Sequence, residues 1–324
     1  MTLAVGVIGT GVMGAEHARL LRDVTSGAHL AAVCDADAGR AAQAAAGGAV
    51  FTEGLDLIAS DKVQAVIIAS PDATHAPYAL ACLRAGKPVL CEKPIAATAA
   101  EGLAIVQAEV AFGRRLVTVG FMRRFDPAYV DMHQTRSAGR IGAPVLLHNI
   151  HRNAAAPDWF TGAMAVTNSL VHEIDISRWL LGSEMTTAQV TSAPGGDPML
   201  VTMQTDKGEI VSTEVFMNAT YGYHVHAQLV GRLGTVEMAA PTRTLTNLAA
   251  SQSYAFPPNW VPRFAEGYRL QMQAWVDAIA KGTHVGASAW DGYVTTAIAE
   301  QIVEGMATGN RIALRIPSRP PLYA

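Results

Sequence analysis

Hydrophobic residues follow two different patterns along this chain of 324 residues. In the first third, short runs that are apolar throughout alternate with segments of helical periodicity. That alternation is typical of parallel strands that helices cover on both faces. The apolar runs are residues 4–8, 30–34, 63–69, 88–91 and 116–119, and the helical segments are 12–24, 74–85 and 99–112. We therefore predict an α/β fold that begins with a doubly wound parallel sheet of the Rossmann type.

The pattern changes after about residue 120. Residues 209–216 and 223–230 alternate between apolar and polar side chains, and glycine-containing turns separate such runs, as in antiparallel strands. Helical periodicity flanks them at 169–181, 264–280 and 289–306. We predict two domains, a Rossmann domain over residues 1–121 and an α+β domain with a large, mostly antiparallel sheet over residues 122–324.

The first apolar run leads directly into a glycine motif, Gly9-Thr10-Gly11-Val12-Met13-Gly14, at the start of the first helical segment. Gly9 allows a tight turn, Gly11 lets a pyrophosphate approach the backbone, and Gly14 lets the helix pack closely on the strand. The first turn of the helix, with Val12 and Met13, offers free N–H groups to the phosphates. The motif predicts a dinucleotide-binding site.

Asp35 follows the second apolar run, where an acidic residue can bind the ribose 2′-hydroxyl of such a cofactor. Its carboxylate would repel the 2′-phosphate of NADP. No basic residue follows before Arg40, which we expect on a solvated helix face. These observations predict NAD as the cofactor.

Composition narrows the class of protein. The net charge is -3, and 50% of the residues are hydrophobic. No basic block appears, so we expect neither a nucleic-acid nor a membrane partner. Cys34, Cys82 and Cys91 form no C-x-x-C pair, which indicates free thiols in a reducing compartment and predicts a cytoplasmic enzyme. His224 and His226 share a strand face but lack a third ligand, so we predict no metal site.

Lys93 follows the fourth apolar run, in Cys91-Glu92-Lys93-Pro94. Ligands bind at the carboxyl ends of strands in such sheets, where a lysine can stabilise a developing alkoxide. The alternative is an ordinary surface lysine.

His172 lies in the predicted helix at 169–181 and shares a face with Asp175, three residues later. A histidine titrates near neutrality and can take a hydroxyl proton while hydride leaves the carbon. The alternative is a buried histidine with satisfied hydrogen bonds. A zinc-protease helix is excluded, because residue 176 is Ile rather than the second histidine of H-E-x-x-H.

Together these motifs resemble the Gfo/Idh/MocA oxidoreductase family over nearly the whole chain, and most closely its bacterial inositol 2-dehydrogenases. The matching blocks are Gly6-Val7-Ile8-Gly9-Thr10-Gly11, Cys91-Glu92-Lys93-Pro94, Val119-Gly120-Phe121-Met122-Arg123-Arg124-Phe125-Asp126, His151-Arg152-Asn153, Leu170-Val171-His172-Glu173-Ile174-Asp175, Tyr221-Gly222-Tyr223 and Ala289-Trp290-Asp291-Gly292-Tyr293.

The resemblance implies NAD-dependent oxidation of a secondary hydroxyl of a cyclic polyol, myo-inositol or a related cyclitol, to a ketone. It implies that Lys93 and His172 are catalytic and that Glu92 and Lys93 also contact the cofactor. It also implies a homo-oligomer, a tetramer or a dimer, formed through an open-faced C-terminal sheet. The residues that it places against substrate hydroxyls are Arg123, Asn153, Asp175 and Tyr223.

One position departs from the family pattern. The inositol dehydrogenases carry an aspartate four residues before the catalytic histidine, and here that residue is Asn168. Asn168 either orients His172 without supplying charge, or it contacts a different substrate. The second interpretation favours an aminocyclitol or pyranose dehydrogenase of the same family. A further alternative is a non-catalytic protein that senses NAD.

Overall fold

The computed structural model describes residues 2–239 and 244–324 of the chain. It divides the chain into two compact units. Unit 1 comprises Met1–Met122, Tyr268–Ala297 and Pro317–Ala324, and unit 2 comprises Arg123–Gly267 and Ile298–Ile316.

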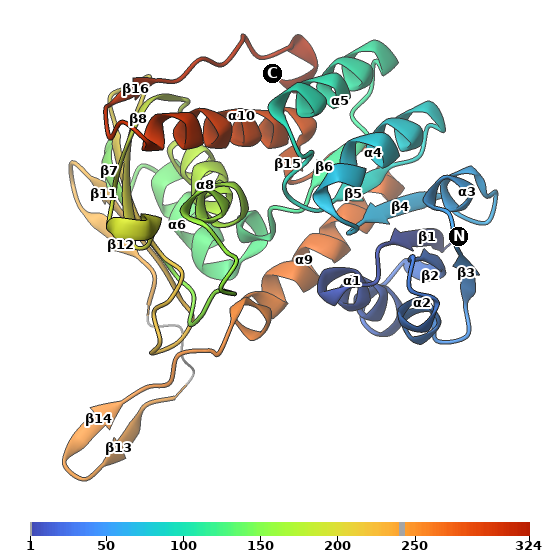
Figure 1. Cartoon of the computed structure of the whole chain (residues 1–324), viewed down its shortest axis with the longest axis horizontal. Coiled ribbons are helices and arrows are strands. Elements are labelled where there is room, and N and C mark those ends of the chain that lie inside the picture. Colours follow the sequence, from blue (N-terminus) through green and yellow to red (C-terminus); the bar gives the residue numbers. More distant parts are fainter. Residues whose placement is uncertain (1, 240–243) are drawn as a thin grey trace. The chain divides into compact units, whose positions relative to one another are not determined.

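Unit 1 is built on a seven-stranded sheet in the order β15-β6-β5-β4-β1-β2-β3 (Figure 1). Every neighbouring pair is parallel except β15 with β6. The strands are β1 (Leu3–Ile8), β2 (Ala28–Cys34), β3 (Ala49–Phe51), β4 (Ala65–Ile68), β5 (Val89–Cys91), β6 (Val117–Val119) and β15 (Ala287–Ser288). The connecting helices are α1 (Val12–Asp23), α2 (Ala38–Ala45), α3 (Gly54–Ala59), α4 (His75–Arg84) and α5 (Ala99–Phe112). The expected doubly wound sheet is confirmed.

The centre of this sheet is apolar because helices pack on both of its faces. Val5, Val7 and Ile67 are completely buried, as strands without a solvated face require. The parallel strands β1, β2, β4, β5 and β6 end at one edge of the sheet, which therefore collects the segments that follow them.

Unit 2 contains a second seven-stranded sheet, in the order β12-β11-β7-β10-β9-β8-β16. Only β10 and β7 pair in parallel, so the expectation of a mostly antiparallel sheet is confirmed. The strands are β7 (Pro144–Arg152), β8 (Met185–Ser192), β9 (Met199–Thr205), β10 (Ile210–Phe216), β11 (His224–Gly231), β12 (Thr235–Glu237) and β16 (Ile312–Ala313). A separate hairpin joins β13 (Thr246–Leu248) to β14 (Ser251–Ser253).

The central strand β7 is buried on one face and partly exposed on the other. Leu147, Asn149 and His151 are buried, whereas His148 between them is exposed. The helical elements of this unit are α6 (Pro127–Ser137), α7 (Gly162–Met164), the π-helix η3 (Ala165–Leu170), α8 (Val171–Leu181) and the 3-10 turn η2 (Met122–Phe125), whose first residue belongs to unit 1.

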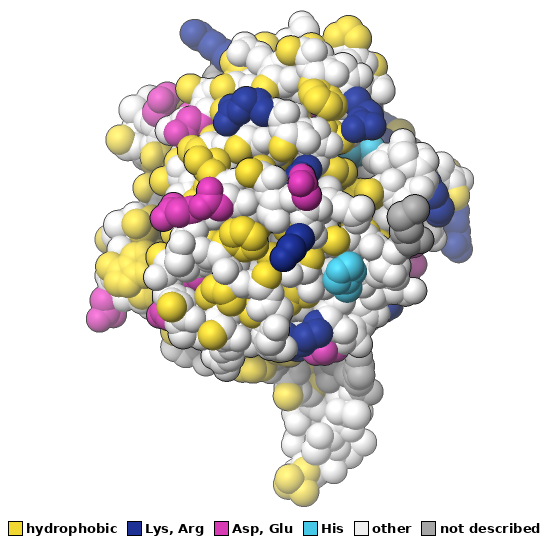
Figure 2. Space-filling view, turned by 90° about the vertical axis from the view of Figure 1, so that its right-hand side faces the viewer, with side chains coloured by type: hydrophobic (Ala, Val, Ile, Leu, Met, Phe, Trp, Pro, Cys, Tyr) yellow, Lys and Arg dark blue, Asp and Glu magenta, His cyan; other side chains and the backbone are white. Residues whose placement is uncertain are grey.

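Two long helices have residues in both units. They are α9 (Trp260–Lys281) and α10 (Ala289–Met306), which the sequence placed wholly after residue 121. In the described part of the chain, no helix has both the length and the apolar composition that a membrane span requires. On the face seen in Figure 2, basic and acidic side chains are interspersed rather than grouped by sign.

A buried carboxylate fastens the C-terminal end of the chain within unit 1. Glu109 of α5 accepts hydrogen bonds from the backbone N–H groups of Leu116 and Val117, at 2.5 and 2.6 Å. The hydroxyl of Tyr323 donates to its other oxygen at 2.6 Å. One side chain thus joins α5, the start of β6 and the chain terminus.

Tyr323→Phe keeps the ring and removes this donor from a buried carboxylate. We expect the free energy of unfolding to fall by about 1–3 kcal/mol, the usual range for a hydrogen bond to a charged group. Urea titration of parent and variant measures the change. Tyr254→Phe, at a partly exposed tyrosine, is the matched control, and an equal response of the two variants would contradict the assignment.

Candidate functional site

The glycine turn after β1 has the shape that a pyrophosphate needs. Gly9 has a φ of +85°, and a Cβ there would lie 2.5 Å from the Ala69 oxygen and the Ser70 nitrogen. A Cβ on Gly14 would lie 1.7 Å from the Gly9 oxygen. A Cβ on Gly11 would meet nothing within 4 Å, so the space in front of this residue is open.

The start of α1 is free to bind an anion. Gly11 is the N-cap and provides no side-chain hydrogen bond to the first turn. Val12 and Met13 follow it, and Val12 is 71% exposed. Uncapped N–H groups at the start of a twelve-residue helix face the open space beside Gly11, so this turn fits the phosphates of a dinucleotide.

Asp35, at the end of β2, is held by four donors. Its Oδ2 accepts from the Thr10 backbone N–H at 2.6 Å and the Thr10 hydroxyl at 2.8 Å. Its Oδ1 accepts from the Asp37 N–H at 2.8 Å and from Arg40 at 2.9 Å. Burial opposes ionisation of Asp35, but these hydrogen bonds outweigh it and hold the pKa of the carboxyl below its usual range. Asp35 is therefore a carboxylate at working pH.

Arg40 differs from its sequence-based interpretation. Its side chain lies on a solvated face of α2, as expected, and is 55% exposed. The guanidinium nevertheless reaches back to Asp35, five residues earlier. The position expected to bind ribose therefore carries a positive charge as well as a negative one.

Lys93 follows β5 and is half-buried. The preceding carboxylate, Glu92, lies 2.8 Å from the His17 ring of α1 and accepts a weak hydrogen bond from the Lys93 backbone N–H at 3.3 Å. A Cβ on Gly120 would lie 2.8 Å from the Glu92 carboxylate and 3.1 Å from its Cα, so a larger residue here would displace Glu92. Glu92, predicted to contact the cofactor, is engaged in holding the backbone that carries Lys93.

In unit 2, Arg123 forms part of a buried cluster of charges. It pairs with Glu173 of α8, and both side chains are at most 1% exposed. His151 of β7 lies 2.9 Å from the other Glu173 oxygen. Burial opposes ionisation of Glu173. The electrostatic attraction of Arg123 and His151 outweighs this effect and lowers the pKa of Glu173. Arg123, predicted to contact substrate, is thus committed to Glu173, and the sequence analysis missed His151 and Glu173.

Asp175 lies in the same helix and is also paired. Arg124 donates to its two oxygens, through Nε at 2.9 Å and Nη2 at 2.6 Å. The Asp175 side chain is 1% exposed. A substrate contact by Asp175 stays a prediction, and such a contact would reach a carboxylate that already has a bidentate partner.

Asn153 and Tyr223 are better placed to receive a polar ligand. Within residues 2–239 and 244–324, the buried side-chain oxygen of Asn153 accepts no hydrogen bond, which is uncommon for a buried polar atom. Burial raises the pKa of Tyr223 above its usual range, although the Arg123 cation opposes this. The phenol therefore keeps its proton and can donate it in a hydrogen bond.

His172 opens α8 and is nearly buried. Its ring centroid lies 6.4 Å from that of His151, which in turn lies 6.1 Å from the Tyr223 ring. Asn168 lies in η3, where its amide donates a long hydrogen bond of 3.5 Å to the Thr167 hydroxyl. The sequence predicted a helix that begins at residue 169, whereas a π-helix already starts at Ala165 and precedes α8; π-helices often occur at functional sites.

The predicted site residues thus fall into two groups. Gly9, Gly11, Gly14, Asp35, Glu92 and Lys93 belong to unit 1, and Arg123, Asn153, Asn168, His172, Asp175 and Tyr223 belong to unit 2. Among the residues that the structure describes, no group of three or more His, Cys, Asp or Glu could hold a metal ion.

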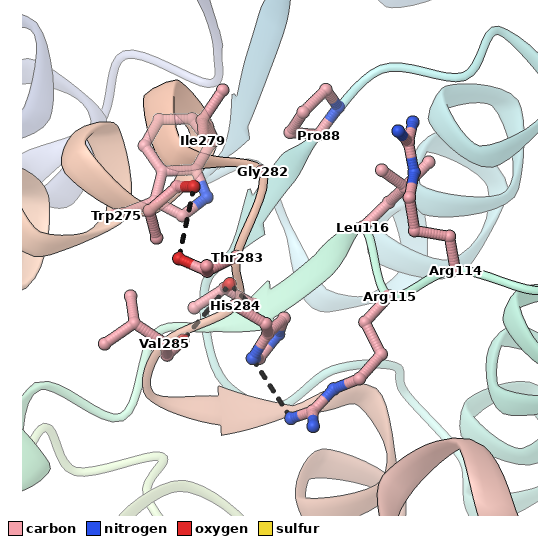
Figure 3. Close-up of a pocket in the computed structure, with 12 residues that line it drawn as sticks. Pro88, Arg114, Arg115, Leu116, Trp275, Ile279, Gly282, Thr283, His284 and Val285 are labelled. Carbon is pink, nitrogen blue, oxygen red and sulfur yellow. Dashed lines mark hydrogen bonds between the residues drawn. The ribbon is translucent and has the colours of Figure 1, made fainter.

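A separate cavity of about 310 Å³ lies at the amino ends of β5 and β6 in unit 1. Figure 3 shows Trp275 and Ile279 on one side of it and Leu116 on the other, with Arg115 hydrogen-bonded to His284 at 3.0 Å. Ligands of open α/β sheets bind at the opposite, carboxyl ends. We therefore do not assign this cavity to the reaction.

Comparison with known proteins gives one consistent answer. The model of the Gfo/Idh/MocA oxidoreductase family for the NAD-binding Rossmann fold matches residues 3–121, and its model for the C-terminal α/β domain matches residues 137–314. Inositol 2-dehydrogenase 1 of Saccharopolyspora erythraea is 50% identical, over 100% of this chain and 99% of its own. Inositol 2-dehydrogenase of Agrobacterium fabrum is 40% identical, over 100% of both chains.

A solved structure matches equally completely. The crystal structure of myo-inositol dehydrogenase from Lactobacillus casei, in complex with NAD(H) and myo-inositol, superposes with a TM-score of 0.96. Its sequence is 31% identical, and the match covers 100% of both chains.

Arg124→Met should leave Asp175 buried and without its bidentate partner. We expect a loss of about 3–5 kcal/mol in the free energy of unfolding, as for other broken buried ion pairs. Arg152→Met is the control, because the Arg152–Glu214 pair is partly exposed and such pairs contribute about 0–1 kcal/mol. Chemical denaturation of the two variants measures both values, and a loss for Arg124→Met that is below about 3 kcal/mol, or no larger than that of the control, would contradict the assignment.

Proposed function

The chain belongs to the Gfo/Idh/MocA oxidoreductase family, and we propose that it oxidises a ring hydroxyl of a cyclic polyol to a ketone with NAD. The substrate is myo-inositol or a related cyclitol. The observation that carries this proposal is the match over both full chains to a myo-inositol dehydrogenase solved with NAD(H) and myo-inositol. The open glycine turn and the ionised Asp35 provide the matching cofactor site in this chain.

Bound NAD supplies the acceptor for the hydride that leaves the carbon. The hydroxyl proton goes to the imidazole of His172, which acts as the general base. The Lys93 ammonium donates to the same oxygen and stabilises the negative charge that develops there. Glu92 pairs with His17 and accepts a hydrogen bond from the Lys93 backbone N–H, so these contacts help to fix the backbone from which the Lys93 side chain extends.

The remaining polar groups of unit 2 divide into two roles. The Tyr223 phenol and the Asn153 carboxamide donate to and accept from substrate hydroxyls. Arg123 and Asp175 act mainly through their buried partners, Glu173 and Arg124, which fix the strand and helix that carry the site. If Arg123 or Asp175 also contacts substrate, it does so through N–H donors or carboxylate oxygens that Glu173 and Arg124 do not occupy.

Asn168 favours a second candidate within the same family. An amide at this position can both donate and accept a hydrogen bond, whereas a carboxylate only accepts, so it can pair with a different substrate group. An aminocyclitol or a pyranose in place of inositol is the alternative that this residue supports.

We also propose a cytoplasmic homo-oligomer, a tetramer or a dimer. The three cysteines are free and buried, which fits a reducing compartment. The partly exposed face of the sheet around His148 is the surface that we expect between subunits. Light scattering coupled to size-exclusion chromatography measures the assembly, and a monomer at working concentration would contradict it.

The function is tested by the absorbance of NADH after NAD is mixed with a substrate panel. The panel contains myo-inositol, scyllo-inositol, an aminocyclitol and a pyranose. We expect turnover with at least one cyclitol. Activity confined to the pyranose or the aminocyclitol would select the second candidate. NAD binding without any turnover would instead support a non-catalytic NAD sensor.

Lys93→Ala and His172→Ala should each lower kcat by about 10²–10⁴-fold, the usual contribution of a positioned acid–base group. The affinity for NAD should change little, because the glycine turn that holds the phosphates stays intact in both variants, although Lys93 is also expected to contact the cofactor. Steady-state assays and NAD titration measure the two effects. The controls are Lys62→Ala and His29→Ala, at exposed positions of the same residue types. A variant that keeps near-parental kcat would show that its residue is not catalytic.

Asn168→Asp should move the rising limb of the pH–rate profile to higher pH. Oxidation requires neutral His172, and an added negative charge nearby favours the protonated ring. Above that limb, turnover of myo-inositol should rise if the chain is an inositol dehydrogenase weakened at this position. Profiles of parent, variant and the exposed control Asn310→Asp decide the point. If the rising limb of the pH–rate profile does not move, residue 168 does not influence the pKa of His172.

A further inference from the structure

The Asp35 carboxylate is already saturated with hydrogen bonds. A carboxylate offers about four acceptor sites. Two are taken by the N–H and hydroxyl of Thr10, one by the Asp37 N–H and one by Arg40. A ribose hydroxyl that donates to Asp35 must therefore displace one of these donors.

Arg40 is the donor that is easiest to displace. Thr10 is buried and directly follows Gly9 of the glycine turn, and the Asp37 N–H belongs to the residue that caps α2. The Arg40 side chain is mostly exposed, and its second acidic contact, Asp37 Oδ2, lies 3.7 Å away. Exposed ion pairs of this kind are weak and are screened by salt.

We propose that Arg40 is a specificity-determining residue of the cofactor site. In the free protein it competes with the ribose hydroxyls of NAD for Asp35. Once displaced, its guanidinium stays on the first turn of α2, within reach of the ribose, and forms a charge-assisted pair with a 2′-phosphate. Asp35 and Asp37 still favour NAD. Arg40 reduces the difference in affinity between NAD and NADP, so the site also binds NADP.

This inference rests on the proposed function in one respect, that the glycine turn binds a nicotinamide dinucleotide. It does not depend on the identity of the polyol. The test is therefore a binding measurement without any polyol: calorimetric titration of the full-length protein with NAD and, separately, with NADP.

Arg40→Gln should weaken NADP binding by about 10-fold or more, the usual effect of losing a charge-assisted hydrogen bond. NAD binding should stay unchanged or become tighter, because Asp35 loses a competitor. Arg40→Lys keeps the cation, which can still pair with a phosphate as a point charge, and should therefore bind NADP more tightly than Arg40→Gln does. The matched control is Arg19→Gln, which removes an arginine of similar exposure that pairs with Glu16 on α1.

Ionic strength gives a second readout. The affinity of the parent for NADP should fall more steeply with salt than its affinity for NAD, because an exposed cation holds the extra phosphate. In Arg40→Gln this difference should shrink.

Three results would overturn the proposal. They are a parent that binds NAD but not NADP, an Arg40→Gln variant with unchanged NADP affinity, and equal losses for both cofactors in that variant. A parent that binds neither cofactor would overturn the proposed function as well. The two failures are therefore distinguishable.

Discussion

A carboxylate that is removed from water needs donors around it, and that requirement organises the candidate site residues within each of the two units. In unit 1, Asp35 is surrounded by N–H, hydroxyl and guanidinium donors, and Glu92 is paired with the His17 ring. In unit 2, Glu173 has Arg123 and His151, and Asp175 has Arg124. An unpaired buried charge would be strongly destabilising. These pairs therefore fix the segments that carry Lys93, His172 and the ribose-binding position.

The sequence predicted those features that neighbouring residues determine. Buried parallel strands are apolar throughout and helices are periodic, so the order of elements up to β6 follows from local patterns. The glycine turn is also local, since Gly9, Gly11 and Gly14 act within one strand-to-helix connection. Lys93 was singled out because it directly follows a buried strand and all such positions of a parallel sheet share one edge; its catalytic role, which the family resemblance implies, stays a prediction.

The contacts that the sequence did not predict join residues far apart in the chain. His17 meets Glu92 across 75 residues, and Arg123 meets Glu173 across 50. A single sequence shows that a charged residue lies in an apolar segment, and this implies a partner without naming it. The family resemblance implied a substrate contact for Arg123, and nothing in its own segment indicated that Glu173 would be its buried partner. The π-helix before α8 was also missed, because no residue in 165–170 distinguishes it from an ordinary helical turn.

The two sets of charges differ in how readily they can exchange partners. Glu173 and Asp175 are buried, so replacing a partner leaves an uncompensated charge that is worth about 3–5 kcal/mol. The Arg40–Asp35 pair is open to solvent on the arginine side, and such pairs contribute about 0–1 kcal/mol. A substitution at Arg40 can therefore alter which cofactor binds without endangering the fold. A substitution in the buried cluster of unit 2 is expected to lower the free energy of unfolding, whether or not it also affects the reaction. Asn168 is half-buried, and its amide donates to the Thr167 hydroxyl at 3.5 Å. Because Asn168 is uncharged, replacing it breaks none of the buried ion pairs described above, so its effect on the choice of substrate can be measured in a folded variant.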